Sequence, residues 1–277
     1  MTVHILGSQG MLGRYITLYM KKFYNVREFN RPEFDAKDVS SIDYIEHFVN
    51  TGDIVINGVG VIKHIRPDKH ADINAILINS AFPRLLANMC EEKKVKMIHP
   101  STDCVFDGLL PFTRRYYETD ESNAIDVYGK TKFLGEPPNC TVIRTSIIGE
   151  EIKQQKSLIE WVKKNANGEI NGYINHRWNG VTCYQFAKIC HEIINKNLFW
   201  NGVKHVFSGD INKYDLVKII NSVFDLRIKV NPVAAPINCN RMLSSVYDMG
   251  FKQPIIIEQI LELKEIHDEL YGDQSSI

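Results

Sequence analysis

The sequence lacks an excess of charge of either sign, because its 277 residues contain 33 Lys and Arg and 33 Asp and Glu. This balance gives no reason to expect nucleic acid or an anionic membrane as the main partner, although a small anionic ligand fits it. No stretch reaches the roughly 18 apolar residues of a membrane span. The N-terminus also lacks the basic and apolar regions of a signal peptide. We therefore expect a cytoplasmic chain, for which a homodimer is one allowed arrangement.

Metal-binding patterns are missing as well. The six cysteines form no Cys-x-x-Cys pair, and no Cys and His cluster has the spacing of a zinc site. We expect reduced thiols and no metal. The hydrophobic fraction of 44% and the charged fraction of 24% are ordinary for a globular protein, which excludes a disordered or fibrous chain.

Short apolar runs alternate with amphipathic stretches in the first half of the chain. The apolar runs predict a buried strand over residues 3–6 and further strands over 53–57, 95–99 and 141–145. A strand is also expected over 25–29. The amphipathic stretches predict helices over 11–23, over a segment that Ser41 would cap, over 72–93 with a bend at Pro83, and over 127–135. This alternation is typical of an α/β fold with a Rossmann-type, doubly wound parallel sheet.

The pattern loosens after Gly149. It predicts helices over 157–166, 183–197, 213–223 and 257–270, with short strands over 204–207 and 227–230. We expect a dinucleotide-binding Rossmann domain over residues 1–150. A smaller, intermittent substrate-binding region would cover residues 151–277, with parts that rejoin the core.

A glycine-rich turn follows the first predicted strand and opens the first predicted helix. Gly7 would allow the tight turn, Gly10 would let the backbone approach a pyrophosphate, and Gly13 would let helix and strand pack closely. The free amides of the helix N-terminus would then bind the phosphates. A tight turn without a ligand is the alternative, but this strand–turn–helix context favours a dinucleotide site that also includes Gln9 and Met11.

The end of the second predicted strand bears on the choice between NAD and NADP. NAD sites place an acid there to hold the ribose diol, and here the segment reads Glu28-Phe29-Asn30-Arg31. The direction of the Glu28 side chain is ambiguous in this pattern. Arg31 can pair with a 2′-phosphate, which favours NADP, with a solvated surface arginine as the alternative.

Two motifs carry the chemistry of a carbonyl reduction. Tyr128 and Lys132 lie four positions apart on a predicted helix and so share a face. A nearby ammonium would lower the pKa of the tyrosine toward the working range. Thr102 follows the fourth predicted strand, where it would bond a substrate carbonyl or merely cap the strand. Asp103 would orient the sugar or close a turn.

These segments resemble the dTDP-4-dehydrorhamnose reductase family, a branch of the extended short-chain dehydrogenases. Beyond the glycine turn, the resemblance rests on four segments in the family's order: Ile56-Asn57-Gly58, residues 101–108, residues 128–132 and Ile143-Arg144-Thr145-Ser146. It covers residues 1–150 well and is looser beyond, with Trp178-Asn179-Gly180-Val181-Thr182 and Asn240-Arg241 as anchors.

The resemblance implies an NADPH-dependent reduction of a 4-keto-6-deoxyhexose carried on a nucleoside diphosphate, with rhamnose synthesis favoured. It implies Thr102, Tyr128 and Lys132 as the catalytic set. It further implies that the glycine turn, Asn57 and Gly58 line the cofactor and that Asn179 and Arg241 lie near the nucleotide-sugar. We also expect Tyr128 and Lys132 to contact the cofactor, and Asp103 to contact the sugar if it does not merely close a turn.

The chain departs from this family at two positions. Cys104 stands where the bacterial reductases usually have Tyr, and Ile147 where they often have Trp. The Cys position is similar to one in the bifunctional UDP-4-keto-6-deoxyglucose 3,5-epimerase/4-reductases, which pair a Cys with a basic residue. Since Cys104 lies two residues past Thr102, an extended segment would point both side chains the same way. A small buried residue is the alternative, and Lys156 and Lys163 are candidate partners by region.

Two other functions stay open at this point. One is a catalytically silent binding protein, because the regulatory subunit of methionine adenosyltransferase resembles the same reductases. The other is a redox-neutral nucleotide-sugar epimerase or dehydratase that retains NAD. The sequence does not distinguish a UDP-linked from a dTDP-linked sugar.

Overall fold

The computed structural model describes residues 1–62, 70–151 and 157–271, and the chain divides into two compact units. The first unit consists of Met1–Asp107, Asp120–Arg144 and Ala187–Lys204. The second consists of Gly108–Thr119, Thr145–Phe186 and His205–Ile277. A segment of the C-terminal half thus rejoins the first unit. That residues 1–150 bind the dinucleotide and residues 151–277 the substrate stays a prediction.

A six-stranded sheet with the order β10-β5-β4-β3-β1-β2 forms the centre of the first unit. Its strands are β1 (Thr2–Leu6), β2 (Asn25–Phe29), β3 (Ile54–Asn57), β4 (Lys96–Thr102), β5 (Thr141–Thr145) and β10 (Gly202–His205). β1 pairs in parallel with both β2 and β3, and β3 pairs in parallel with β4. The chain order therefore reverses at β1, between β2 and β3, which is where open α/β sheets bind ligands. The predicted doubly wound sheet is confirmed.

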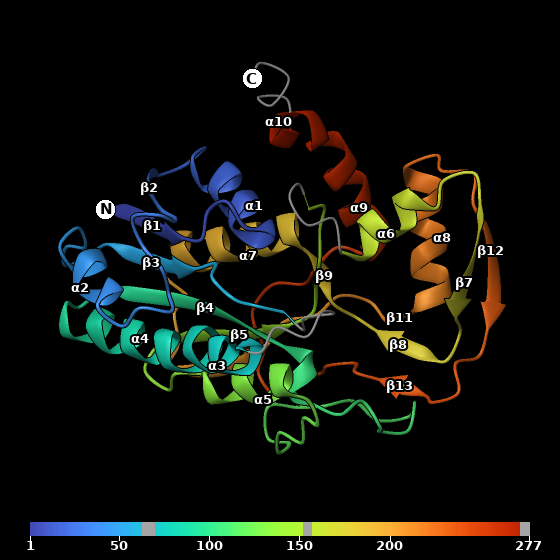
Figure 1. Ribbon diagram of the computed structural model, residues 1–277, viewed down its shortest axis with the longest axis horizontal. Helices are drawn as coiled ribbons and strands as arrows, with labels where there is room; N and C mark the ends of the chain where they lie inside the picture. The colour runs from blue at the N-terminus through green and yellow to red at the C-terminus, as the bar shows by residue number, and fades with distance from the viewer. Residues whose placement is uncertain (63–69, 152–156, 272–277) are drawn as a thin grey trace. The chain divides into compact units, whose positions relative to one another are not determined.

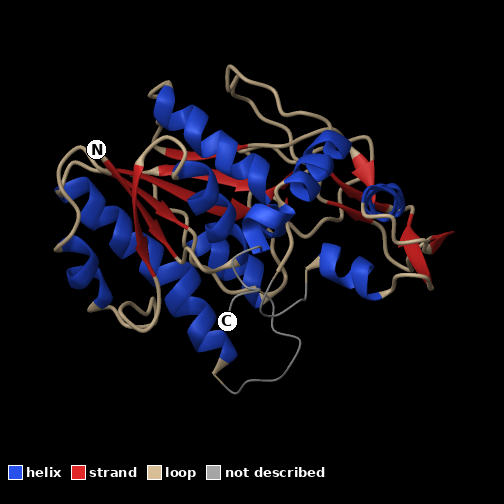
Figure 2. Ribbon diagram, turned by 90° about the horizontal axis from the view of Figure 1, so that it is seen from above, coloured by secondary structure: helices blue, strands red, loops and turns tan. Residues whose placement is uncertain are grey.

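Helices cover both faces of this sheet (Figures 1 and 2). They are α1 (Met11–Met20), α2 (Ser41–Glu46), α3 (Ala71–Ile76), α4 (Phe82–Glu92), α5 (Val127–Leu134) and α7 (Cys183–Asn195). Figure 1 shows α1 and α7 on one side of the sheet and α3, α4 and α5 on the other. A hydrogen bond of 3.0 Å between Tyr24 Oη and His191 Nδ1 links the segment after α1 to α7.

The helix predicted over 72–93 contains a π-helical turn, Leu77–Ala81, between α3 and α4. Pro83 follows at the start of α4 and has no N–H to donate to the carbonyl of Asn79. Gly135, at the end of α5, packs against that carbonyl so closely that a Cβ there would lie 1.7 Å from the Asn79 oxygen. In place of the predicted bend at Pro83, the helix therefore has a π-turn, against which the end of α5 packs.

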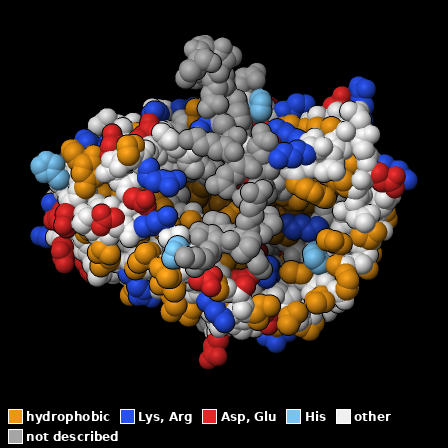
Figure 3. Space-filling view, in the orientation of Figure 1, with side chains coloured by type: hydrophobic (Ala, Val, Ile, Leu, Met, Phe, Trp, Pro, Cys, Tyr) orange, Lys and Arg blue, Asp and Glu red, His pale blue; other side chains and the backbone are white. Residues whose placement is uncertain are grey.

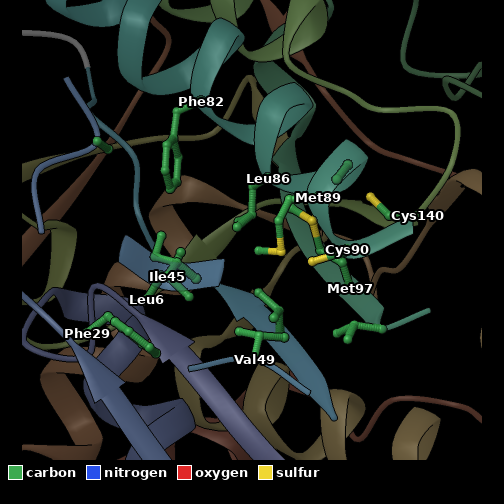
Figure 4. Packing of buried hydrophobic residues seen from close by; sticks show 14 of the residues in the cluster. Leu6, Phe29, Ile45, Val49, Phe82, Leu86, Met89, Cys90, Met97 and Cys140 are labelled. Atoms are coloured by element: carbon green, nitrogen blue, oxygen red, sulfur yellow. The ribbon is translucent and has the colours of Figure 1, made fainter. Parts of the chain in front are cut away.

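Buried side chains of β1–β5, α2 and α4 form one apolar cluster of the first unit (Figure 4). In Figure 4 the sulfur-containing side chains of Met89, Cys90, Met97 and Cys140 gather on one side of this cluster. Burial raises the pKa of the Cys140 thiol to about 12 and that of Cys90 further, so both thiols are inert at neutral pH. They contribute packing, as expected of reduced cysteines.

The second unit combines short strands with four helices among its described residues. The helices are α6 (Leu158–Lys164), α8 (Lys213–Val223), α9 (Ile256–Glu265) and α10 (His267–Tyr271). The strands are β6 (Ile147–Ile148), β7 (Glu169–Tyr173), β8 (His176–Trp178), β9 (Val181–Thr182), β11 (Ile211–Asn212), β12 (Lys229–Val233) and β13 (Cys239–Asn240). They form three small sheets: β11-β8-β13, β12-β7 and β6-β9.

Several expected elements differ from the observed ones. Ser41 does not cap α2, because it lies inside the helix and its Oγ donates to the carbonyl of Asp35 at 2.8 Å. The strand expected over 204–207 is β10, which begins two residues earlier, and the strand expected over 227–230 is β12. The last predicted helix is split into α9 and α10.

The surface shows no concentration of one charge on the face drawn in Figure 3, where basic and acidic side chains are interspersed. Within the described part of the chain, no helix is long and apolar enough to cross a membrane. The same residues contain no group of three or more side chains able to hold a metal ion.

Candidate active site

The glycine turn joins β1 to α1 at the point where the strand order reverses. Gly7 has a φ of +72°, a conformation that favours glycine, and its N–H donates to the carbonyl of Phe29 at 2.8 Å. A Cβ on Gly13 would lie 2.1 Å from the Gly7 oxygen, so only glycine lets α1 approach the strand. Gly10, at the N-cap of α1, provides no side-chain cap. The first-turn amides therefore fit the pyrophosphate of a dinucleotide.

The end of β2 is bonded to this turn. Asn30 Oδ1 accepts from the Gln9 N–H at 3.0 Å, and its Nδ2 donates to Ser8 Oγ at 2.6 Å. Ser8 in turn donates to Glu28 at 2.6 Å, and Lys21 forms an ion pair with Glu28 at 2.7 Å. Burial raises the pKa of Glu28, but the hydrogen bonds from Lys21 and Ser8 together bring it below its usual value. The carboxylate that an NAD site would use is thus engaged by the protein.

Arg31 follows this segment and is exposed. No ion pair or hydrogen bond to its guanidinium is found among the described residues. An exposed arginine just past the second strand is available to a 2′-phosphate. Asn30, which sequence reasoning did not single out, supports the turn; its place beside the predicted ribose position is the signal that identifies it.

The Asn57-Gly58 turn ends β3 beside the glycine turn. Gly58 N–H donates to the Leu6 carbonyl at 2.9 Å, and a Cβ on Gly58 would lie 2.8 Å from that oxygen. Asn57 Oδ1 accepts from the Val59 N–H at 3.0 Å, and its Nδ2 lies 3.1 Å from His99 Nδ1. Both polar groups of the Asn57 side chain are therefore bonded within the protein. Its contact with a cofactor stays a prediction, and the backbone of this turn is the part available for it.

Thr102 ends β4 at the carboxyl edge of the sheet and is buried. Its Oγ1 accepts from the Cys104 N–H at 3.1 Å and caps the 3₁₀ helix Asp103–Val105. The same hydroxyl lies 3.2 Å from Asp103 Oδ1 and forms a hydrogen bond with the Tyr128 side chain. The capping role that the sequence left open for Thr102 is therefore observed, and the same hydroxyl lies against Tyr128. Its bond to a substrate carbonyl stays a prediction.

Tyr128 and Lys132 lie one turn apart on α5, as the spacing predicts. Burial raises the pKa of Tyr128 and so does the proximity of Cys104, while the hydrogen bond with Thr102 acts in the other direction. Lys132, which we expected to lower that pKa, is buried and donates to the Pro100 carbonyl at 2.7 Å. Burial lowers the pKa of Lys132 to about 8. Tyr128 is therefore a protonated phenol at neutral pH.

A buried ion pair fixes α5 to the strands that flank it. Arg144 on β5 donates to the two carboxylate oxygens of Glu136 at 2.7 and 2.6 Å, and both side chains are 5% exposed. Ser101, the residue before Thr102, donates to the same carboxylate at 2.5 Å. Sequence reasoning missed Glu136, although an arginine in the middle of an apolar strand signals a buried acidic partner.

Cys104 does not follow the extended geometry expected of it. β4 ends at Thr102, and residues 103–105 form the 3₁₀ helix, so the alternation of an extended strand does not apply to Cys104. Cys104 is half-buried, and its effect on the pKa of Tyr128 still places it near that hydroxyl. Asp103 also raises the pKa of Tyr128 and is buried.

The two candidate basic partners of Cys104 give no support to a pairing. Lys163 forms an ion pair with the buried Glu150 and stacks over Phe224 at 4.3 Å from the ring centroid. Lys156 lies outside the described residues.

Of the three residues expected near a nucleotide-sugar, Asn179 and Arg241 lie in the second unit and Asp103 lies in the first. Asn179 is buried, and its amide bonds both the N–H and the carbonyl of Leu243, at 2.9 and 2.8 Å. Asn240 bonds the carbonyls of Pro111 and Arg114 at 2.8 and 3.0 Å. Both asparagines therefore hold the segment that carries the half-buried Arg241. The aliphatic part of Arg241 packs on Gly108, whose missing Cβ would lie 3.0 Å from Arg241 Cγ.

The sheet order, the glycine turn and the polar strand ends define a Rossmann-type fold of the dehydrogenase and reductase class. A solved dTDP-4-dehydrorhamnose reductase from Bacillus anthracis, in complex with NADP, has this fold, with a TM-score of 0.78, 23% identity and coverage of 96% of this chain and 99% of that one.

At the level of sequence, the chain belongs to the family described as the RmlD substrate binding domain, which matches residues 1–250. The dTDP-4-dehydrorhamnose reductase of Mycolicibacterium smegmatis is 30% identical over 149 residues, which cover 51% of this chain and 44% of that protein. The match thus spans about half the length of this relative. The methionine adenosyltransferase 2 subunit beta of Mus musculus is 24% identical over 255 residues, covering 81% of this chain and 72% of that protein.

Proposed function

We propose that the chain is an NADPH-dependent reductase of the C4 ketone of a nucleotide-linked 4-keto-6-deoxyhexose. The observation that carries the proposal is the hydrogen bond between Thr102 and Tyr128, with Lys132 one turn further along α5, at the carboxyl edge of a sheet that begins with the glycine turn. The family and the names of its reductase members support the substrate class.

In this proposal Thr102 holds the carbonyl oxygen of the sugar and Tyr128 donates the proton that this oxygen gains. NADPH supplies the hydride to C4 when it is bound. The raised pKa of Tyr128 suits a donor, because it keeps the phenol protonated at neutral pH. One N–H of the Lys132 ammonium is used by Pro100, and its other donors would anchor the nicotinamide ribose.

Arg31 supports NADP rather than NAD. It is exposed just past β2, whereas Glu28 is engaged by Lys21 and Ser8. We assign the dinucleotide to the domain of residues 1–150 and the nucleotide-sugar to residues 151–277. Arg241 would bind a phosphate of the sugar nucleotide, and Asn179 would position the 240–243 segment.

The proposal is tested by following NADPH oxidation with UDP- and dTDP-linked 4-keto-6-deoxy sugars. Oxidation with either sugar, and formation of the corresponding 4-hydroxy product, is the expected result. The Thr102→Val variant keeps the shape of the side chain and removes its hydroxyl, so it should lose most of the activity while still binding NADPH. Absence of oxidation with both sugars would refute the proposal.

A binding module without catalysis is the second candidate, favoured by the similarity to the methionine adenosyltransferase subunit beta. Such a protein would bind the dinucleotide and a stable protein partner without oxidising NADPH. The pairing of Thr102 with Tyr128 weighs against it. A pull-down that recovers a stoichiometric partner, together with an inactive chain, would favour this second candidate.

A finer proposal concerns Cys104 and rests on the reductase function. A 3,5-epimerase removes a proton alpha to the ketone and returns one to the opposite face, and a thiolate near Tyr128 could take that proton. The test supplies unepimerised UDP-4-keto-6-deoxyglucose and NADPH in heavy water. Deuterium at C3 and C5 of the product, lost in Cys104→Ala, is the expected result. Reduction only of sugar that has already been epimerised would leave a plain 4-reductase.

A further inference from the structure

A cavity lies in the first unit, at the amino ends of the strands, far from Thr102. Its volume is about 240 Å³. The residues that line it come from the end of α4, the starts of β4 and β5, and the loop before β10. β4, β5 and β10 are neighbours in the sheet. Because β4 runs for seven residues, roughly 20 Å separate the cavity from the carboxyl edge.

The walls of this cavity are fixed by hydrogen bonds. Thr141 Oγ1 donates to the Trp200 carbonyl at 2.8 Å and accepts from the Trp200 N–H at 3.1 Å. Gly202 N–H donates to the Cys140 carbonyl at 2.9 Å, and the indole N–H of Trp200 donates to the Gly202 carbonyl at 3.0 Å. Figure 4 shows Cys140 and Met97, which form the inner wall, at one side of the apolar cluster. The site is therefore preformed.

Two lysines on the rim have no partner among the described residues. Lys94 and Lys96 line the cavity, are exposed, and form no ion pair with a carboxylate of the described residues. Lys94 has a φ of 60° at the end of α4, a position that glycine usually fills. Glu91 also lines the cavity, but Asn139 Nδ2 donates to its carboxylate at 2.7 Å and so engages it. Two ammonium groups against one carboxylate give the rim a net positive charge.

Aromatic rings stand beside this charge. Phe199 and Trp200 line the cavity and are half-buried, and the ammonium of Lys204 lies 4.7 Å from the centroid of the Trp200 ring. Cations next to an aromatic surface fit a ligand that joins a phosphate to a planar base, since a base stacked on an aromatic ring gains about 1–3 kcal/mol. The volume of the cavity lies just below the range of ligand pockets, about 300–1,000 Å³, so the cavity suits a ligand no larger than a single nucleotide.

We propose that this cavity is a second, non-catalytic site for a nucleoside monophosphate, with the base on Trp200 and the phosphate on Lys94 and Lys96. At this distance from Thr102 the ligand cannot touch the reacting atoms. The proposal does not depend on the reductase function, because it concerns binding at a different end of the sheet.

The test uses a local signal. The chain has three tryptophans, so labelling with 5-fluorotryptophan gives three fluorine resonances, and the Trp200→Phe variant assigns one of them. Titration with uridine 5′-monophosphate should shift the Trp200 resonance with saturation. The double variant Lys94→Ala/Lys96→Ala should weaken this binding at least about tenfold, equivalent to about 1.4 kcal/mol.

Two controls make the outcome decisive. Lys93→Ala removes a neighbouring lysine that contacts Glu46, and it should leave the titration unchanged. Ribose 5-phosphate carries the phosphate without the base and should bind more weakly. A Trp200 resonance that does not move, or that moves equally in the double variant, overturns the site. Equal affinity for ribose 5-phosphate overturns the assignment to a nucleotide.

Discussion

Replacing Arg144 by Met should cost the chain a large part of its stability. The change leaves the Glu136 carboxylate, 5% exposed, without its two bonds of 2.7 and 2.6 Å, and with the Ser101 hydroxyl and the electrostatic attraction of Lys132. Breaking a buried ion pair by removing one partner typically costs about 3–5 kcal/mol. Since a domain is stabilised by roughly 5–15 kcal/mol in total, the midpoint of urea unfolding should fall far while the m-value stays unchanged.

The double variant Arg144→Met/Glu136→Leu separates the pair from simple packing. It removes both charges and keeps similar volume, so most of the lost free energy of unfolding should return. This second variant also covers the case in which the single variant does not fold. Lys196→Met is the matched control, because its ion pair with Glu192 is exposed and should contribute under about 1 kcal/mol. If Arg144→Met costs no more than this control, the pair is not desolvated in solution.

Three further predictions concern the candidate active site. Tyr128→Phe should lower turnover by about 10²–10⁴-fold without loss of NADPH binding, measured by fluorescence titration; near-normal turnover would remove Tyr128 from its role. Lys132 has a folded pKa of about 8, below its unfolded value of about 10.4. The unfolded chain therefore binds more protons between these values, and the free energy of unfolding should rise with pH across this window by up to about 3 kcal/mol relative to Lys132→Met. A constant difference between the two proteins would contradict the shifted pKa. Arg31→Ala should raise KM for NADPH about tenfold or more and leave that for NADH unchanged, since it removes a charged contact of about 1.5–3 kcal/mol; equal effects on both cofactors would assign Arg31 to another role.

Most of the sheet of the first unit could be predicted because β1, β3, β4 and β5 contain apolar runs long enough to be recognised, whereas β2 and β10 are more polar. β6, β9, β11 and β13 have two residues each, so no periodicity can reveal them. The π-turn before Pro83 packs against Gly135 of α5, a contact distant in sequence that local patterns do not show. Local patterns therefore recovered the elements that fold around their own hydrophobic runs and missed those fixed by distant contacts.

The same limit applies to the candidate active site. Spacing alone placed Tyr128 and Lys132 on one face of α5, because the helix sets that geometry. It could not show that burial, rather than the ammonium of Lys132, governs the pKa of Tyr128, because that depends on the packing around the hydroxyl.

The motif residues inferred from the resemblance are of two kinds. Some can contact a ligand directly, and others fix the backbone around the site. Asn57 and Asn179 have their amides bonded within the protein, at the Val59 N–H and at both backbone groups of Leu243. Thr102 differs, because its hydroxyl lies against Tyr128. Its one hydrogen is donated to Asp103, so Thr102 must turn that hydrogen away from Asp103 to hold a carbonyl oxygen. Substitutions at the two asparagines therefore act on ligands through the backbone that they fix, and loss of binding there does not identify a direct contact. Only groups with a free donor or acceptor, such as the remaining N–H groups of Lys132, qualify for that role.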